Sequence, residues 1–269
     1  MLLTADIGNT SISLGVFDGE ALVEKFRLAS DKDLSQQEYE VLLKTLCKPF
    51  AINGCIIASV VDELSKKFQL AVDNVFNIKA LMLTCECETG VKISLENPKE
   101  AGADRIANAC GAFMLYEKPC IVVDFGTATS FDIINKNGEF IGGVITPGLN
   151  LQMKVLNKFT SKLPKIDVAI STKAIGNNTS EAILSGVIRG TACLIEGLVE
   201  QCEAELGGGN DLTNASGCSP NCEKVKAVLI ATGGYSGLIS SYLKRPFDFI
   251  NPTLTLEGLR FLYDLNTKQ

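Results

Sequence analysis

The sequence predicts an α/β protein made of two similar halves, each beginning with a meander of strands. The main observation is three short apolar runs that each end in a turn rich in glycine and hydroxyl residues. Short apolar runs bounded by such turns are typical of buried strands. The runs and the turns that follow them are Met1–Ala5 with 6–10, Cys120–Val123 with 124–129, and Val228–Ala231 with 232–236.

The first two turns share the pattern Asp-x-Gly and are followed by alternating polar and apolar residues. This pattern predicts a strand, a tight turn and an antiparallel strand in each half. Asp18-Gly19-Glu20 and Asn137-Gly138-Glu139 then supply a second hairpin signal in each half. We therefore expect a duplicated architecture, with one half at 1–117 and the other at 118–269.

Helical periodicity predicts three helices, at Ser35–Leu46, Asp104–Tyr116 and Ser180–Glu205. Glycines within the last of these, at 186, 190 and 197, suggest close helix packing. The segment Gly207–Cys222 is dominated by Gly, Asn and Ser, and we expect a surface loop there.

The composition excludes several classes of function. The chain has 269 residues, a net charge of −6 and no histidine. An acidic chain without a Lys/Arg cluster does not fit a nucleic-acid-binding protein, because such proteins carry a basic stripe. Without histidine, the Ser-His-Asp and Cys-His mechanisms are absent. Acid–base chemistry near neutral pH must then use carboxylates, Lys, Tyr or Cys.

The chain shows no secretion signal, and no segment approaches the roughly 20 apolar residues of a membrane span. We therefore expect a cytoplasmic protein that does not bind membranes. Its ten cysteines are expected to be reduced, and most of them lie in apolar runs. A zinc site at Cys85/Cys87 and Cys218/Cys222 is an alternative, although neither spacing is the usual two-residue knuckle.

The turn after the first strand is suited to binding phosphate. Gly8 allows the backbone to turn sharply and to approach a ligand. Backbone N–H groups and the side chains of Asn9 and Thr10 can line a phosphate, and Asp6 can hold a metal ion through water. The alternative for one such turn is an ordinary hairpin that begins with Asp.

The second Asp-x-Gly turn favours the phosphate interpretation. Asp124 and Thr127 repeat the arrangement of a carboxylate before glycine and hydroxyl groups. Two such turns in similar halves are expected to face each other across an ATP-binding cleft, with Thr232-Gly233-Gly234 as a platform for the base or ribose. Neither a Walker A sequence nor a Gly-x-Gly-x-x-Gly fingerprint is present.

Another motif, Gly102-Ala103-Asp104-Arg105, precedes a predicted helix. Asp104 is suited to cap that helix. It is equally suited to serve as a carboxylate base beside a guanidinium for an anionic substrate. The spacing alone leaves both interpretations open.

The motifs together resemble those of type III pantothenate kinases, which belong to the acetate-kinase, sugar-kinase and actin superfamily. The ordered set spans nearly the whole chain. It comprises Asp6–Thr10, Gly102–Arg105, Asp124–Thr129, Gly142–Gly148, Asn178-Thr179, Ala231–Gly234 and Leu254–Leu259.

The resemblance implies a duplicated actin-like ATPase fold, related to ribonuclease H, and ATP-dependent phosphorylation of pantothenate, the first step of coenzyme A synthesis. It implies that Asp104 accepts the hydroxyl proton. The implied ATP contacts are Asp6, Ile7, Gly8, Asn9, Thr10, Ser11, Ile12, Ser13 and Thr127. The implied pantothenate contacts are Leu95, Gly102, Ala103, Asp104, Arg105 and Thr179.

The resemblance also implies Mg²⁺ with ATP, K⁺ or NH₄⁺ at Asp124, and a homodimer. Many relatives carry Tyr where this chain has Leu95, so an apolar wall is expected there.

Two other functions are weighed against this one. A kinase of the same superfamily with another substrate would keep the phosphate turns but not Gly102–Arg105. A regulatory protein without catalysis would have lost one of Asp6, Asp104 and Asp124, and all three are present.

Overall fold

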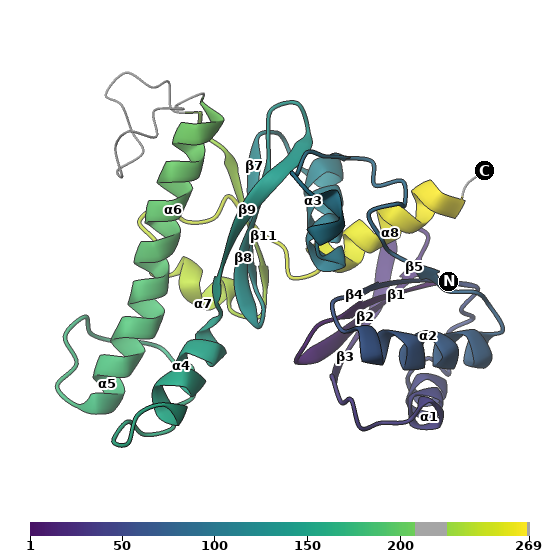
Figure 1. Ribbon diagram of the computed structural model, residues 1–269, viewed down its shortest axis with the longest axis horizontal. Helices are drawn as coiled ribbons and strands as arrows, with labels where there is room; N and C mark the ends of the chain where they lie inside the picture. Colours follow the sequence, from purple (N-terminus) through teal and green to yellow (C-terminus); the bar gives the residue numbers. More distant parts are fainter. Residues whose placement is uncertain (208–224, 268–269) are drawn as a thin grey trace. The chain divides into compact units, whose positions relative to one another are not determined.

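A computed structural model describes residues 1–207 and 225–267 of the chain. Contacts group the residues into two compact units (Figure 1). The first unit comprises Met1–Leu115 and Thr253–Gln269, and the second comprises Tyr116–Pro252. The final helix thus groups with the first unit, whereas the sequence division at 117/118 assigned it to the second half. Its packing against a helix of the first unit accounts for this difference.

The first unit has a five-stranded sheet in the order β3-β2-β1-β4-β5. The strands are β1 (Leu2–Ile7), β2 (Ser11–Asp18), β3 (Ala21–Ala29), β4 (Gly54–Ser59) and β5 (Leu81–Met82). The first three form the predicted antiparallel meander, while β4 runs parallel to β1. The predicted turn after β2 is confirmed, with Gly19 at φ 59°. The unit also contains the short strand β6 (Lys92–Ile93) and the 3₁₀ turn η1 (Pro98–Glu100).

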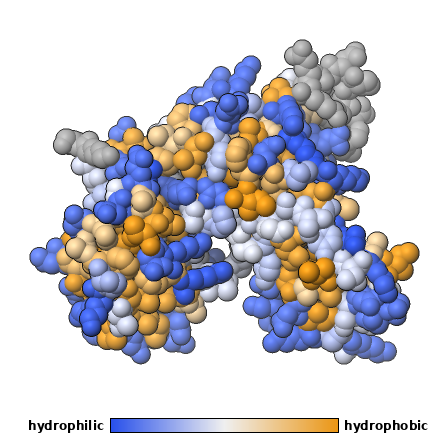
Figure 2. All heavy atoms as spheres, turned by 180° about the vertical axis from the view of Figure 1, so that it is seen from behind, coloured by the Kyte–Doolittle hydropathy of each residue, from blue (hydrophilic) through white to orange (hydrophobic). Residues whose placement is uncertain are grey.

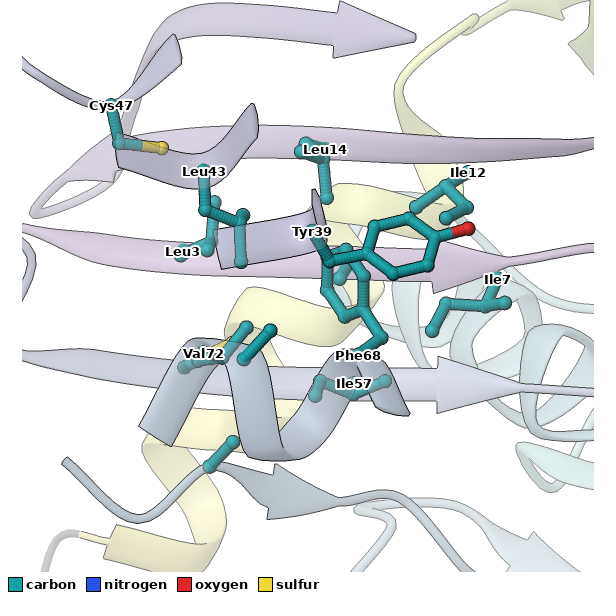
Figure 3. Packing of buried hydrophobic residues seen from close by; sticks show 14 of the residues in the cluster. Leu3, Ile7, Ile12, Leu14, Tyr39, Leu43, Cys47, Ile57, Phe68 and Val72 are labelled. Carbon is teal, nitrogen blue, oxygen red and sulfur yellow. The ribbon is translucent and has the colours of Figure 1, made fainter. Parts of the chain in front are cut away.

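Helices cover both faces of this sheet (Figure 1). One face packs against α1 (Gln36–Leu46) and α2 (Asp62–Phe76), and the other against α3 (Ala103–Leu115) and α8 (Leu254–Thr267). Alternation along β4 explains the two cores: Cys55 and Ile57 lie in the first, and Ile56 and Ala58 in the second. Figure 3 shows side chains of β1, β2, β4, α1 and α2 converging in the first core.

The two helices of the first core are fixed by local and tertiary contacts. Ser35 caps α1 in a capping box with Glu38, since each side chain accepts a bond from the other's backbone N–H. The ring of Tyr39 then packs edge-on against Phe68 of α2, with centroids 5.6 Å apart. The Tyr39 hydroxyl donates to the carbonyl of Asp31 at 2.8 Å, so its buried polar end is satisfied.

The second unit repeats the meander. Its strands lie in the order β11-β10-β7-β8-β9. They are β7 (Cys120–Phe125), β8 (Ala128–Ile134), β9 (Glu139–Pro147), β10 (Val228–Gly233) and β11 (Phe249–Ile250). The predicted turn at Asn137-Gly138 is confirmed, with Gly138 at φ 76°. One face packs against α4 (Leu149–Lys158), α5 (Thr179–Leu184), α6 (Gly190–Leu206) and α7 (Ser236–Ser240).

The predicted helix at 180–205 is continuous but contains a π-helical turn, η2 (Ser185–Arg189), between α5 and α6. The expectation of close packing at Gly186, Gly190 and Gly197 is wrong, because a Cβ atom at any of the three would meet nothing within 4 Å. These glycines face open space. Gly207 ends α6, and the remainder of the predicted loop at 207–222 lies outside the described residues.

The helix Thr179–Leu206 is long and apolar enough to cross a membrane by length and composition alone, although no such segment was expected from the sequence. It also contributes Val187, Ala192, Ile195 and Val199 to the second unit's core. A core helix passes the same test.

The predicted burial of cysteines in apolar runs is confirmed for Cys55, Cys110 and Cys120, whereas Cys193 on α6 is exposed.

Candidate active site

The turn between β1 and β2 is closed by a backbone bond. Gly8 N–H donates to the Ser11 carbonyl at 3.0 Å, which reverses the chain within three residues. Asn9 and Thr10 lie exposed at the tip. Asp6 stands directly opposite Ser13 in the strand register. Side chains at opposed positions share one face of the sheet, so a carboxylate and a hydroxyl lie together at the base of this turn.

The end of β3 braces the same turn. The Ser30 hydroxyl donates to the Gly8 carbonyl at 2.6 Å, and its amide donates to the Thr10 carbonyl at 3.1 Å. Arg27 Nη2 donates to Ser11 Oγ at 3.1 Å. The turn at 6–13 is therefore held by three hydrogen bonds from β3 and the residue that follows it, as a preformed phosphate site requires.

The loop that contains Gly102 contacts the segment next to this turn. Val60 N–H donates to the carbonyl of Ile7 at 3.1 Å. The side chain of Val60 in turn lies against Gly102, because a Cβ atom on that glycine would stand 3.6 Å from Val60 Cγ1. Val60 thus connects the predicted phosphate turn with the predicted substrate loop inside the first unit.

Asp104 is the second residue of α3 rather than its N-cap. Gly102 occupies the cap position, since its carbonyl accepts the Ile106 amide at 3.0 Å. Asp104 Oδ1 accepts the Arg105 amide at 2.8 Å, so the carboxylate satisfies one first-turn amide. The predicted capping role is therefore met only in part, by a bond to a first-turn amide that fixes the direction of the carboxylate, and the role of Asp104 as a base stays a prediction.

The space beside this carboxylate depends on Gly102. A Cβ atom there would approach Asp104 Oδ1 to 2.5 Å, closer than real Cβ atoms come. Burial raises the pKa of Asp104, while the Arg105 backbone bond and guanidinium oppose the rise. A carboxylate with a raised pKa is a stronger base than an ordinary aspartate. The side chains of Leu95 and Arg105 are half-buried, and Ala103 is buried.

The second unit holds its carboxylate in a similar way. Asp124 lies opposite Ser130 in β8 and opposite Thr232 in β10. Gly233, at φ 83°, comes so close that a Cβ atom would stand 2.7 Å from Asp124 Oδ1. The carboxylate therefore lies among two cross-strand hydroxyl residues and packs closely against Gly233.

Thr127 lies exposed at the tip of this second turn. The Gly126 amide donates to the Ala128 carbonyl at 3.0 Å, and the Gly148 amide donates to the Thr127 carbonyl at 3.1 Å. Gly148 packs so tightly that a Cβ atom would approach that carbonyl oxygen to 2.5 Å. Thus Gly148, in the predicted 142–148 motif, holds the turn.

Thr179 is the first residue of α5, after the N-cap Asn178. It lines a pocket of about 580 Å³ whose walls come from α4, α5 and η2. The walls are mostly apolar, with Gln152 as the other polar residue among those that line the pocket. The Gln152 amide already donates to the Pro147 carbonyl at 2.8 Å.

The structure thus brings the 6–13 turn and the 102–105 loop together within the first unit. Asp124, Thr127 and Thr179 belong to the second unit. Sequence reasoning missed Val60, Ser130 and the contact between Gly233 and Asp124. Only the glycine pair at 233–234 gave a signal, because glycine beside a strand end suggests close backbone approach.

Among residues 1–207 and 225–267, no group of three or more Cys, Asp or Glu side chains that could hold a metal ion is found. The zinc alternative needs Cys218 and Cys222, which lie outside those ranges. Cys85 and Cys87 are half-buried and free.

Comparison with known proteins identifies the family. The family model described as type III pantothenate kinase matches residues 2–201. A type III pantothenate kinase of Dehalococcoides mccartyi strain CBDB1 is 42% identical over 270 residues, covering 98% of this chain and 96% of its own. One from Thermus thermophilus is 38% identical, covering 96% and 97%.

The chain belongs to the type III pantothenate kinase family. Solved structures support the actin-like fold of this family member. MreB 5 of Spiroplasma citri superposes with a TM-score of 0.52 at 11% identity, covering 99% of this chain and 97% of its own. The ethanolamine utilization protein EutJ of Carboxydothermus hydrogenoformans gives 0.51 at 14% identity, covering 97% and 89%. The predicted fold class is confirmed.

Gly102→Ala should lower the kinase activity while leaving the fold intact. The added Cβ atom must displace the Asp104 carboxylate, and a misplacement of about 1 Å can cost about a hundredfold in rate. Turnover and far-UV circular dichroism check both parts. Gly197→Ala is the matched control, because a Cβ atom there meets nothing. Equal activity in the two variants would contradict the role given to Gly102.

Proposed function

We propose that the 6–13 turn grips the ATP phosphates and that Asp104 takes the substrate proton in the phosphorylation of pantothenate, the reaction of the family. The contact chain from Ile7 through Val60 to Gly102 carries this proposal. It connects the predicted phosphate turn with the loop before Asp104, whose half-buried carboxylate has a pKa raised by burial.

The reaction forms one bond and breaks one. The hydroxyl oxygen of pantothenate bonds to the γ-phosphorus of ATP, and the bond from that phosphorus to the β–γ bridging oxygen breaks. The hydroxyl proton passes to Asp104, and ADP leaves. Because the transition state of phosphoryl transfer is loose, the protein contributes mainly position and charge neutralisation. Asp104 therefore needs to accept the proton only late in the step.

Asp6 and the hydroxyl groups of the turn suit a nucleotide that arrives with Mg²⁺. Mg²⁺ keeps several waters and uses one or two carboxylates together with substrate phosphates. Asp6, with Ser13 opposite it, provides such a partial donor set. Bound there, the ion would offset phosphate charge. The exposed residues Asn9 and Thr10 would contact the ATP, and we propose Thr127 as a further ATP contact.

Asp124 suits a monovalent cation. Its cross-strand neighbours Ser130 and Thr232 add hydroxyl oxygens, and alkali cations prefer oxygen ligands. At Gly233 the backbone comes close to the carboxylate and to the Phe125 carbonyl oxygen, which a Cβ atom there would approach to 2.7 and 2.6 Å. K⁺ or NH₄⁺ held there would balance negative charge near the nucleotide.

Pantothenate carries a carboxylate, which Arg105 can bind in bidentate form. Leu95 and Ala103 would form an apolar wall of the pantothenate site, and Thr179 would offer a hydroxyl group to the substrate.

We assign the enzyme to the cytoplasm, without nucleic acid or membrane as partner.

We also assign a homodimer, with the surface around α4 and α5 as its contact. Apolar side chains are unusually exposed there, with Phe159 at 74%, Ile170 at 69% and Ile175 at 87%. Figure 2 shows apolar residues at the surface of the second unit among hydrophilic ones. Large exposed apolar patches are typical of interaction surfaces.

Asp104→Asn should reduce turnover of pantothenate with ATP by at least about a hundredfold, without lowering the unfolding temperature. Burial raises the pKa of Asp104, so its ionisation destabilises the folded state as the pH rises through that pKa. The uncharged Asn avoids this penalty. ADP release and thermal unfolding measure the two effects. For the wild type, kcat/KM should fall as the pH falls through a pKa above that of ordinary aspartate.

If Asp104→Asn retains its activity, Asp104 is not the proton acceptor and serves only as a helix-end contact. Turnover of another small alcohol in place of pantothenate would favour a different kinase of the superfamily. A chain with neither activity would favour the regulatory protein.

Replacement of K⁺ by Na⁺ should lower turnover, since the smaller ion fits the Asp124 position less well. The Asp124→Asn variant should lose most of this cation dependence. ADP release at matched ionic strength measures it. Equal rates in the two salts would remove the cation role from Asp124.

Ile175→Glu combined with Phe159→Glu should shift the chain from dimer to monomer, because burying the new carboxylates at an interface is unfavourable. Sedimentation velocity measures the change. Val41→Glu is the control, since Val41 is 64% exposed on α1 of the first unit. A wild-type chain that sediments as a monomer would refute the assignment.

A further inference from the structure

We propose that Thr255 of α8 is a positioning residue for the phosphoryl-transfer step: its hydrogen bond to Asn108 holds the turn of α3 that directly follows Asp104. The inference rests on the proposed role of Asp104 as proton acceptor. It concerns contacts within the first unit alone.

The bond joins the half-buried Thr255 to a buried residue. Thr255 Oγ1 donates to Asn108 Oδ1 at 2.7 Å, and Asn108 is fully buried. Asn108 is four residues after Asp104, so the two side chains lie on the same face of α3, one turn apart. A movement of Asn108 is therefore transmitted to Asp104 through a single helical turn.

The helices α3 and α8 approach closely enough for this bond to have a defined geometry. Figure 1 shows the two helices side by side. A Cβ atom on Gly258 would collide with the carbonyl oxygen of Ala107. A Cβ atom on Gly111 would stand 2.9 Å from the carbonyl oxygen of Leu254. Backbone meets backbone at two points that flank Asn108, so little sliding of α3 along α8 is possible.

The sheet that carries the phosphate turn holds α8 from the other side. Leu256 lies against Gly15 of β2, where a Cβ atom would stand 3.2 Å from Leu256 Cδ1. Tyr263 lies against Gly54 of β4 so closely that no Cβ atom would fit. Since β1 and β2 carry the 6–13 turn, α8 fixes the position of α3 relative to that turn. Thr255 is a side chain through which this support reaches the turn of α3 next to Asp104, by its bond to Asn108.

The test compares Thr255→Val with Thr255→Ser in the full-length enzyme. Valine keeps the shape but removes the donor, and serine keeps the hydroxyl. For Thr255→Val we expect kcat to fall by about tenfold to a hundredfold, with an unchanged KM for ATP. For Thr255→Ser we expect kcat close to that of the wild type.

Thr267→Val is the control on the same helix. Its hydroxyl donates within α8, to the Tyr263 carbonyl at 2.7 Å, rather than to α3. This variant should keep the wild-type kcat. Far-UV circular dichroism and thermal unfolding confirm that each variant is folded at the assay temperature.

A purely structural role would lower the unfolding temperature of Thr255→Val and leave kcat unchanged for the folded enzyme; that result would overturn the inference. Equal losses in Thr255→Ser and Thr255→Val would do the same, because the hydroxyl would then be irrelevant. Asp104→Asn is measured in the same assay. If it stays active, the role of Asp104 fails. If it is inactive and Thr255→Val is fully active, only the positioning role fails.

Discussion

Backbone segments of this protein approach one another more closely at a few glycines than a Cβ atom would permit. Gly102 leaves room for the Asp104 carboxylate, and Gly233 leaves room for the Asp124 carboxylate. Gly258 brings α8 onto the backbone of α3. Each unit thus combines a carboxylate with a neighbouring glycine that packs closely against it. A side chain at Gly102 or Gly233 would press on a carboxylate, whereas one at Gly258 would press on the backbone of α3.

The two units use a shared strand geometry for this purpose. Asp6 faces Ser13 across β1 and β2, and Asp124 faces Ser130 across β7 and β8. The duplication therefore extends from the order of strands to the register of individual side chains. The surroundings differ: β4 lies beside Asp6 and contributes Ala58, whereas β10 lies beside Asp124 and contributes Thr232. This difference makes the second carboxylate richer in oxygen neighbours, as a cation site needs.

Much of this was predictable from the sequence, because the signals are local. Alternation and Asp-Gly or Asn-Gly turns gave both meanders, and helical periodicity gave α1, α3 and the long helix. Glycine beside polar residues at strand and helix ends indicated Asp6–Thr10 and Gly102–Arg105, and the resemblance to type III pantothenate kinases extended the first set to Ser13 and implied the substrate role of the second. Contacts between distant residues were not predictable. Thr255 and Asn108 are 147 positions apart, and no periodicity reports such a pair. The π-helical turn escaped prediction for another reason, since its residues continue the same apolar pattern as α5 and α6.

The packing of α8 also has a consequence for biosynthesis. A ribosome releases the strands of the first unit early, yet the helix that completes the core around Ile56, Ile106 and Leu259 follows the whole second unit in the sequence. Domains ordinarily fold as units while synthesis proceeds. Here the face of the sheet that packs against α3 and α8 lacks α8 until the second unit has been synthesised. A polypeptide that stops before α8 would leave part of that apolar face exposed, so the first unit is complete only after synthesis has passed through the second.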